Sequence, residues 1–588
     1  MCGIVGFIDK KNHLSKTQGE KIIKEMIKSL RHRGRDDEGF FAHNNVYLGQ
    51  ARLSIIDLTA SGHQPMISSS EKTVTVFNGE IYNFLNTKNI LQANKKFQTN
   101  CDTEILLNAY EQWGLEKSLA YHKGMFAFGL LDKEKNQLHL SVDRFGIKPL
   151  YYINNKNFFA FASEIKALLK IPGVKAELNR SGLEEYLIFR HLAGKNTLFK
   201  NIFKLSPANY LSIDLRNYNF TQKQYWRLSK HKINNNNYHK LISNLLNASI
   251  KEHLIADVPV GLQLSGGVDS SLVASLASKQ SKKNIHSFSI GLKDKNWNEF
   301  FYSQKVAKKI KTQHHQLLFS EKQFCSLLPK LTYHLDEPMD HSHSIPMYLL
   351  AKYARNKVKI LLSGEGADEI FGGYKKYKNI DSRSNDRDII NLSAFGDKNI
   401  LSQVIKVPFK NKFVGHEKIL KEYKHLKPFD KLSILDQKIY LLSMLVRQDK
   451  MGMAANIENR VPFLDHQLVE AAFSLPQNEK IRNKETKYIL KKIAEKFVPK
   501  DCIYRDKVGF GQPIGQWFRN DAGLGKFLNL FKNKKRNFIN YDQLNRIIVE
   551  HKNGTKDHGQ TLWILVNLEI WHRIFIDKVD YKKIYKSL

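Results

Sequence analysis

Residues 258–271, Val-Pro-Val-Gly-Leu-Gln-Leu-Ser-Gly-Gly-Val-Asp-Ser-Ser, determine the architecture of the longer half of this 588-residue chain. The first seven, 258–264, form an apolar run typical of a buried strand, and the residues after the two glycines suit the start of a helix. Adjacent glycines let the backbone turn tightly, and the N–H groups of a helix N-terminus attract an anion. The stretch predicts a strand, a phosphate-binding loop and a helix in succession, with an ordinary glycine-rich turn as the alternative.

Two further apolar runs, 286–291 and 358–362, also read as core strands, and helical patterns separate them. Strands that alternate with helices predict a parallel α/β sheet. From about residue 430 onward the pattern is mostly helical. The longer half of the chain is therefore expected to be an α/β domain with additional helices.

A second glycine-rich loop, 363–374, follows the last of these strands. Its carboxylates Glu365, Asp368 and Glu369 suit Mg²⁺ binding together with a general base. The alternative is an acidic helix N-terminus that the helix dipole favours. A dinucleotide fingerprint does not fit, because the third glycine of that pattern is missing and carboxylates would repel a pyrophosphate unless a metal intervened.

The first part of the chain has a different character. Residues 17–30 have the periodicity of an amphipathic helix. Strand-like runs follow, separated by turn residues, which predicts an antiparallel sheet with flanking helices; the runs are 74–77, 125–131, 138–142 and 158–161. The polar stretch 231–237 is the best candidate for a linker between the two parts.

The chain opens with Met-Cys-Gly-Ile-Val-Gly-Phe, residues 1–7. If Met1 is removed, Cys2 carries both a thiol and a free α-amine, so the base is part of the nucleophile's own backbone. The α-amine has a pKa of roughly 7.7–8.0, which suits a proton acceptor near neutral pH. Cys2 is thus a candidate N-terminal nucleophile, and an incidental cysteine is the alternative.

Composition narrows the class of protein. The hydrophobic content of 42% and charged content of 26% are typical of a globular protein, and no apolar run approaches the length of a membrane span. The first apolar stretch ends at residues 9–11, Asp-Lys-Lys, so no signal peptide is expected. Four cysteines are too few for a disulfide scaffold and have no metal-ligand spacing. We expect a cytoplasmic protein with reduced thiols.

The formal net charge of +36 raises nucleic-acid binding as a possibility. The lysines are spread along the whole chain and form no dense basic tail. A lysine-rich, solvated surface is therefore the preferred interpretation, and no nucleic-acid partner and no membrane partner are expected. The histidine pairs 314–315 and 341–343 lack the partner spacing of a metal site and are interpreted as structural.

These motifs, taken together, identify a family. Over nearly its full length the chain resembles the glutamine-hydrolysing asparagine synthetases of the bacterial B type. The first half resembles a class II glutamine amidotransferase domain in its Cys-Gly-Ile start and in residues 31–34, 51–55, 78–83, 102–104, 124–128 and 143–146. The second half resembles a synthetase with the PP-loop of ATP pyrophosphatases in residues 265–271, 363–374, 458–465 and 507–511. Arg35 departs from the family, which usually has proline there, and we expect a change in local rigidity but not in chemistry.

The resemblance implies roles for residues of the first half. Cys2 would attack the side-chain amide of glutamine, and the Asn78 side chain with the Gly79 N–H would form the oxyanion hole. Arg52 would clamp the α-carboxylate of glutamine and Asp102 would pair with its α-ammonium. The full set expected to bind glutamine is Arg52, Leu53, Ser54, Ile55, Ile56, Asn78, Gly79, Glu80 and Asp102.

The resemblance also implies a nucleotide site. Asp269 and Asp368 would bind Mg²⁺, and Glu365 would serve as the base, or organise the tetrahedral state, when ammonia attacks. Lys507 would contact phosphate charge. The residues expected to bind ATP are Leu264, Ser265, Gly266, Gly267, Asp269, Ser270, Ile290, Ser363, Gly364 and Lys507.

The expected fold is an α+β N-terminal-nucleophile sandwich over residues 2–214, followed by an α/β PP-loop parallel sheet with additional helices over residues 235–588. The expected reaction amidates aspartate through a β-aspartyl-AMP intermediate. ATP and glutamine are consumed, and AMP, pyrophosphate and glutamate are released. A buried passage for ammonia between the two sites is implied. The partners are small molecules, and a homodimer is left open.

Alternatives keep part of this chemistry. The nearest rival amidates another carboxylate, such as a sugar uronic acid in polysaccharide biosynthesis. A PP-loop enzyme that modifies tRNA is more remote, because the additional half matches a glutaminase and not an RNA-binding module. β-Lactam-forming relatives generally lack the N-terminal cysteine that is present here. A catalytically dead binding protein is the non-enzyme alternative, and intact candidate residues in both halves argue against it.

Overall fold

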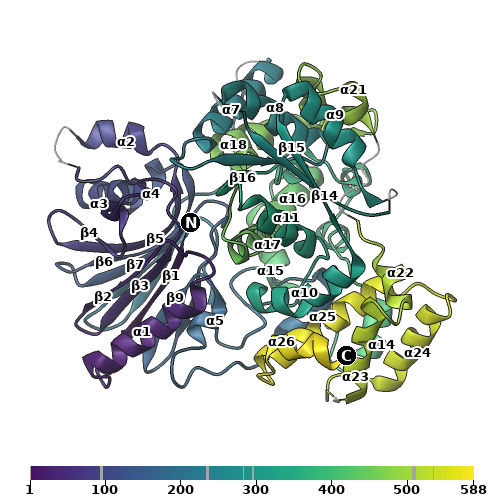
Figure 1. Ribbon diagram of the computed structural model, residues 1–588, viewed down its shortest axis with the longest axis horizontal. Coiled ribbons are helices and arrows are strands. Elements are labelled where there is room, and N and C mark those ends of the chain that lie inside the picture. The colour runs from purple at the N-terminus through teal and green to yellow at the C-terminus, as the bar shows by residue number, and fades with distance from the viewer. Residues whose placement is uncertain are drawn as a thin grey trace.

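The computed structural model describes residues 2–92, 97–233, 237–281, 284–294, 297–505, 511–533 and 536–588. Two regions lie side by side in Figure 1: a β-rich N-terminal half in purple and blue, and a larger half in which helices surround a parallel sheet. A group of helices from the C-terminal end, drawn in yellow-green and yellow, covers the lower side of the second half.

The N-terminal half contains two six-stranded antiparallel sheets. One has the order β10-β8-β9-β1-β3-β2, and the other has the order β12-β11-β7-β6-β5-β4. The strands of the first are β1 (Gly3–Asp9), β2 (Asp37–His43), β3 (Val46–Arg52), β8 (Tyr151–Asn154), β9 (Phe158–Ala162) and β10 (Phe203–Lys204). Those of the second are β4 (Met66–Ile67), β5 (Thr73–Ile81), β6 (Gly124–Asp132), β7 (Gln137–Val142), β11 (Asn209–Asp214) and β12 (Phe220–Gln224).

The two sheets pack face to face over a shared apolar core. Buried side chains from β1 and β3 in one sheet and from β5, β6 and β7 in the other form a single cluster. Helix α1 (Lys16–Leu30) packs on β1 and β3, while α3 (Asp102–Trp113) packs on β5. This four-layer arrangement confirms the predicted α+β sandwich, and the predicted helix 17–30 is present with its apolar face buried.

The second half is organised by a five-stranded parallel sheet of order β15-β14-β13-β16-β17, which confirms the predicted α/β domain. Its strands are β13 (Val260–Gln263), β14 (His286–Leu292), β15 (Gln313–Phe319), β16 (Ile360–Leu362) and β17 (Glu458–Arg460). The strand order reverses between β13 and β16, and ligands of such sheets bind at this switch point, outside the carboxyl ends of the strands. The two glycine-rich loops follow these two strands.

Helices cover both faces of the parallel sheet, and α8 begins directly after the first glycine-rich loop. Several helices of this half are α7 (Tyr238–His253), α8 (Val268–Gln280), α10 (Glu321–Leu335), α11 (Ser344–Ala354), α12 (Ala367–Phe371), α17 (Leu441–Ala454), α20 (Tyr488–Ala494) and α25 (Gly559–Phe575). Other helices of the chain include α2 (Phe84–Leu91), α4 (Leu115–Tyr121), α5 (Ile165–Leu168), α6 (Leu183–Phe189), α9 (Phe300–Ile310), α14 (Lys398–Val404), α15 (Val414–Glu422), α16 (Pro428–Leu435), α18 (His466–Ser474), α21 (Lys500–Tyr504), α22 (Ile514–Arg519), α24 (Tyr541–Lys552) and α26 (Tyr581–Ile584).

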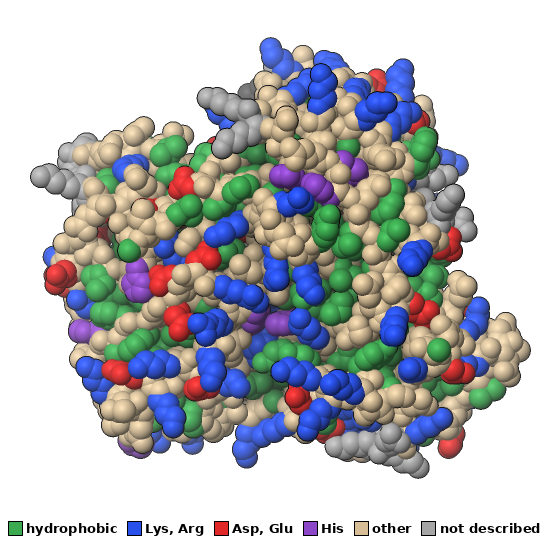
Figure 2. Space-filling view, viewed as in Figure 1, with side chains coloured by type: hydrophobic (Ala, Val, Ile, Leu, Met, Phe, Trp, Pro, Cys, Tyr) green, Lys and Arg blue, Asp and Glu red, His purple; other side chains and the backbone are tan. Residues whose placement is uncertain are grey.

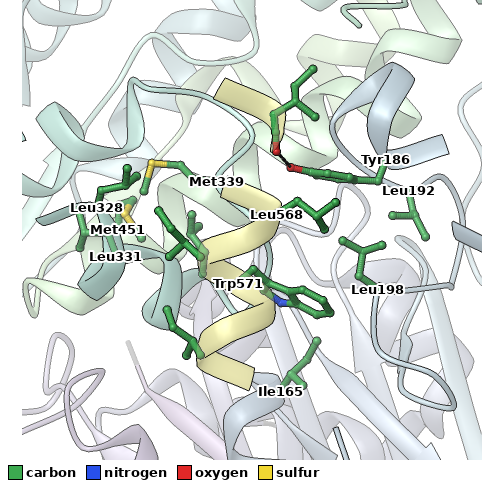
Figure 3. Close-up of a cluster of buried hydrophobic side chains, with 14 of the residues drawn as sticks. Ile165, Tyr186, Leu192, Leu198, Leu328, Leu331, Met339, Met451, Leu568 and Trp571 are labelled. Carbon is green, nitrogen blue, oxygen red and sulfur yellow. Dashed lines mark hydrogen bonds between the residues drawn. The ribbon is translucent and has the colours of Figure 1, made fainter. Parts of the chain in front are cut away.

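A buried apolar cluster joins the two halves. Figure 3 shows Ile165, Tyr186, Leu192 and Leu198 from the first 200 residues packed around Leu568 and Trp571 of α25, with α10 and α17 on the other side. The Trp571 indole N–H donates to the Asp336 carbonyl at 2.8 Å, and the Tyr186 hydroxyl donates to the Ile564 carbonyl at 3.3 Å. Burial of several large apolar side chains, each worth about 1.5–3 kcal/mol, holds the two halves in one arrangement.

No helix among the described residues is both long enough and apolar enough to cross a membrane. Figure 2 shows that Lys and Arg side chains are scattered over the face in view and do not gather in one patch.

Candidate functional site

Cys2 immediately precedes β1 and is buried. Its backbone nitrogen donates to Asn78 Oδ1 at 2.9 Å, and its carbonyl oxygen accepts from Arg33 Nε at 3.1 Å. The Asn78 side chain lies in the middle of β5 with no exposed surface, and its Nδ2 has no hydrogen-bond partner among the described residues. Asn78 thus holds the nitrogen of Cys2 and keeps a buried N–H donor without a partner among the described residues.

Glycine is required at position 79 for steric reasons. A Cβ at Gly79 would lie 2.1 Å from the Met125 carbonyl oxygen and 2.5 Å from Phe126 Cα on the neighbouring strand β6. The backbone φ of Gly79 is +155°, a conformation that side chains with a Cβ rarely adopt. The strand therefore approaches β6 closely at the position predicted to contribute an oxyanion-hole N–H.

Arg52 lies at the end of β3, beside the start of β1. Gly3 pairs with Ala51 in the sheet, so Cys2 and Arg52 are the next residues beyond this pair. The guanidinium donates to the Asp57 carbonyl at 2.6 Å and to the Thr59 carbonyl at 3.3 Å, which wraps the loop after β3 around it. The predicted contact residues of this loop are all buried; they are Leu53, Ser54, Ile55 and Ile56.

Asp102 is the first residue of α3 and approaches the end of β5. Its Oδ2 accepts from the Ile81 N–H at 2.9 Å. Burial raises the pKa of Asp102 to about 6, because a charged carboxylate is disfavoured away from water. The neighbouring Glu80 is buried as well, and burial together with the charge of Glu458 raises its pKa. The structure thus brings Cys2, Asn78, Gly79, Arg52 and Asp102 to one end of the sandwich.

The loop of residues 264–267 has the geometry of an anion cradle. Gly267 is the N-cap residue of α8 and makes no side-chain capping hydrogen bond. The N–H groups of the first turn of α8 are therefore available to a ligand. Ser265 Oγ lies 3.0 Å from Ser270 Oγ and accepts from the Gly267 N–H at 3.3 Å. Gly266 has φ +81°, and a Cβ there would lie 2.5 Å from the Ser303 nitrogen. Only glycine fits this turn, which confirms that the loop closes directly onto the helix.

The second loop lies against the first at the switch point. A Cβ on Gly364 would approach the Ser270 nitrogen to 2.8 Å. Ser363 is buried and its Oγ accepts from Gln448 Nε2 at 2.6 Å. Leu264 and Ile290, predicted to line the adenosine region, are both buried; Leu264 directly follows β13 and Ile290 lies within the adjacent strand β14.

Lys487 joins the two loops and was not among the predicted site residues. Its Nζ lies 2.6 Å from Asp269 Oδ2 and 2.7 Å from Asp368 Oδ1, and its side chain is 5% exposed. It precedes α20 with φ +55°, far along the chain from both aspartates. No motif around it identified it, because the contact arises only from tertiary folding. Lys507, predicted to contact phosphate, lies outside the described residues.

The three carboxylates of the second loop differ in environment. Glu365 Oε1 lies 3.6 Å from Arg447 Nη2, a guanidinium of α17. Glu369 is buried in α12, and burial with the neighbouring Asp368 charge raises its pKa to about 8, so it is mostly protonated near neutral pH. A protonated carboxyl is a poor ligand for a cation, so Glu369 is the least suited of the three to hold one.

The histidines read as structural lie at two places. His314, on β15, is within hydrogen-bond reach of Ser287 Oγ at 2.9 Å. His341 is buried before α11, and burial lowers its pKa well below the usual range. Among the residues that the structure describes, no three His, Cys, Asp or Glu side chains are grouped so as to hold a metal ion.

The two sites define the class of protein. At one end of the sandwich, the nitrogen of a buried cysteine is bonded to Asn78, whose amide donor has no partner within the described part of the chain. At the switch point of the parallel sheet lies a PP-loop type cradle with two carboxylates joined by a lysine. Such a chain joins a cysteine-dependent amidotransferase to a nucleotide-dependent synthetase.

Comparison with known proteins agrees with this class. The glutamine amidotransferase domain model matches residues 1–226, and the asparagine synthase model matches residues 241–573. The chain is 31% identical to the glutamine-hydrolyzing asparagine synthetase 1 of Bacillus subtilis, with 98% of this chain and 97% of the relative covered. It is 30% identical to asparagine synthetase 3 of the same organism, with 91% and 90% covered. The chain belongs to the asparagine synthase family, and it is an ATP- and glutamine-dependent ligase.

Proposed function

We propose that this enzyme amidates aspartate to asparagine, with ammonia drawn from glutamine at Cys2 and with aspartate activated as its β-adenylate. The observation that carries the acceptor assignment is a pocket lined by Arg447, the residue that pairs with Glu365. It lies between the C-terminal end of α6 and helix α17. Three cationic and two acidic side chains line it: Arg190, Lys204, Arg447, Glu337 and Asp340.

The two guanidinium groups of this pocket carry N–H donors that are not used within the described part of the chain. Arg447 Nε and Nη1 and Arg190 Nε are buried without hydrogen-bond partners among the described residues. An unpaired buried donor is costly, so these N–H groups suit a ligand carboxylate. Asp340 and Glu337 offer negative charge to an ammonium group. The pocket matches the zwitterionic head of an α-amino acid. Arg447 also contacts Glu365, beside which the side-chain carboxylate of aspartate would be activated.

The glutaminase half supports a covalent route. After removal of Met1, the free amine of Cys2 would take the thiol proton, and the sulfur would attack Cδ of glutamine. The Asn78 Nδ2 donor and the Gly79 N–H would hold the oxyanion, each such donor being worth roughly 2.7–4 kcal/mol. The amine would return the proton to departing ammonia, and water would then release glutamate from the thioester.

The synthetase half supports activation by adenylation. The acceptor carboxylate would attack the α-phosphorus of ATP, and pyrophosphate would leave against the N–H groups of the 264–267 loop. Ammonia would attack the carbonyl carbon, lose a proton to Glu365 and expel AMP. Lys487 would offset phosphate charge from its position between Asp269 and Asp368.

The aspartate pair fits a divalent cation. Asp269 Oδ1 is buried without a hydrogen-bond partner among the described residues, and carboxylate oxygens are the ligands that Mg²⁺ prefers. Asp269 and Asp368 would hold the ion, with phosphate oxygens completing its shell. When bound, the ion would neutralise charge on the phosphates.

We propose the division into two functional units as residues 2–214 and 235–588. The second sheet of the sandwich extends past this first unit through β12, and residue 235 lies outside the described residues. A cytoplasmic location and the lack of a nucleic-acid partner stay predictions.

The acceptor is tested directly. Purified protein incubated with glutamine, ATP and Mg²⁺ is given either aspartate or galacturonate, and mass spectrometry follows the amide products. We expect asparagine and no galacturonamide, because a uronic acid leaves the acidic side of the pocket without an ammonium partner. The proposal would be contradicted if the enzyme made no more asparagine than a Glu365→Ala control. If galacturonamide alone were formed, the acceptor would be a sugar acid and not aspartate.

Glutamine hydrolysis should depend on pH through Asp102. Because burial raises the pKa of Asp102 to about 6, the carboxyl loses its charge as pH falls through that value and can no longer pair with the α-ammonium of glutamine. Below this pKa we expect kcat/KM for glutamine to fall by a further factor of about ten per pH unit, in addition to any fall that protonation of the Cys2 amine causes. Steady-state glutamate release between about pH 5 and 8 measures it. If an Asp102→Asn variant lost kcat/KM for glutamine over the same pH range as the unaltered enzyme, Asp102 would not be the group that titrates.

A further inference from the structure

The backbone of Cys2 is held at both ends, and only one of the two holding residues belongs to the predicted site. Asn78 fixes the nitrogen, and Arg33 fixes the carbonyl oxygen through its Nε at 3.1 Å. With both ends of the residue fixed, the sulfur can move only by rotation about the Cα–Cβ bond. The placement of Arg33 therefore contributes to the aim of the nucleophile.

Arg33 is in turn held by one carboxylate from each half of the protein. Its Nη1 donates to Glu164 Oε1 at 2.9 Å, and its Nη2 donates to Asp449 Oδ2 at 2.8 Å. Arg33 is fully buried, and the side chains of Glu164 and Asp449 are at most 1% exposed. Asp449 lies on α17 of the synthetase half and also accepts from Lys148 Nζ at 3.3 Å. The two buried charges on Arg33 and Asp449 depend on each other, because an unpaired buried charge is strongly unfavourable.

The neighbours of Asp449 on α17 reach the other site. Arg447 pairs with Glu365, and Gln448 Nε2 donates to Ser363 Oγ at 2.6 Å. Three consecutive residues, 447–449, thus contact the candidate base, the nucleotide loop and the arginine that holds Cys2. A rigid turn of helix lies between the two reaction centres.

We propose that Asp449, a residue of the synthetase half, is a positioning residue for the glutaminase nucleophile and acts on Cys2 through Arg33. This inference rests on the proposed role of Cys2 in glutamine hydrolysis. Asp449 holds Nη2 of Arg33 while Glu164 holds Nη1, which leaves Nε aimed at the carbonyl of Cys2. The glutaminase site is complete only when α17 is docked against it, so hydrolysis is confined to the assembled enzyme.

The test is an Asp449→Asn variant in the full-length protein. The amide keeps the shape of the carboxylate but removes the charge that orients Arg33. We expect kcat for glutamine hydrolysis to fall about 10- to 100-fold, as misplacement of a reacting group by a fraction of an ångström does. KM for glutamine should stay unchanged, because Arg52 and Asp102 do not contact Asp449. Ammonia-dependent synthesis, measured as pyrophosphate release, should be retained.

Matched variants separate positioning from general damage. Gln467→Ala removes an exposed contact between the halves, where Gln467 Oε1 accepts from Lys123 Nζ at 2.6 Å, and should leave both activities unchanged. A Lys148→Met/Asp449→Asn double variant removes one charge of each sign and should reproduce the fall in kcat if the single variant folds poorly. Unchanged kcat in either folded variant would overturn the inference, as would an equal loss of both activities. Failure of Cys2→Ala to stop hydrolysis would instead overturn the proposed function.

Discussion

Replacing Cys2 with alanine abolishes glutamine-dependent synthesis and leaves ammonia-dependent synthesis intact. The sulfur is the nucleophile proposed for the glutaminase half, and loss of the nucleophile of a covalent hydrolase lowers kcat by about 10⁶-fold. The glycine-rich loops of the synthetase half follow strands of the parallel sheet, whereas the thiol lies beside β1 of the sandwich, and ammonia supplied from solution replaces the product of hydrolysis. The measurement compares asparagine formation with glutamine and with ammonium chloride, at a pH where part of the ammonia is unprotonated.

A second buried cysteine provides the control. Cys325 lies in α10, where burial raises the pKa of its thiol to about 12, so it is not a reactive thiolate. Cys325→Ala should keep both activities. If Cys2→Ala lost ammonia-dependent synthesis together with glutamine-dependent synthesis, the division into two separate sites would be wrong.

Replacing Lys487 with methionine produces the opposite pattern. The ammonium group lies between Asp269 and Asp368, and without it two carboxylates face each other and the incoming triphosphate. Removal of one such electrostatic group costs about 10²–10³-fold in kcat. We expect this loss with either nitrogen source, while glutamine hydrolysis continues at Cys2. Pyrophosphate release and glutamate release, followed in the same reaction, measure the two halves separately.

Lys491 is the matched control for this substitution. It lies one turn further along α20 and pairs with Glu485 at 3.0 Å, away from both aspartates. Lys491→Met should keep pyrophosphate release at the level of the unaltered enzyme. If Lys487→Met synthesised at the normal rate, Lys487 would have no role in the nucleotide site, and Lys507 would stay the candidate for the phosphate contact.

Local patterns were sufficient for much of the fold. The apolar run and glycines of residues 258–271 form β13, the cradle and the start of α8, although the strand itself is shorter and spans Val260–Gln263. The helix predicted over residues 17–30 begins one residue earlier, at Lys16. Strand β15 was missed, because its opening Gln-His-His-Gln is polar and edge strands need no apolar alternation on both faces.

In the candidate sites, too, some features could be predicted from the sequence and others could not. Cys2 and the two glycine-rich loops could be named from sequence, because the chemistry of each depends on adjacent residues. Asn78, Gly79, Arg52 and Asp102 could be named only through the resemblance to a known family. The pKa of Asp102 near 6 and of Glu369 near 8 could not, because both depend on burial by segments distant in the chain. Which carboxylate carries charge is a property of the packed structure.

The sequence by itself determined the two chemistries, a cysteine beside its own amine and a glycine-rich anion cradle, because backbone geometry and nucleophile identity are local properties. Only the tertiary structure decided which distant charges complete each site. Lys487 meets Asp269 across 218 residues, and Arg33 meets Asp449 across 416. Buried ions must be paired wherever the fold brings them together, and no local pattern encodes that meeting.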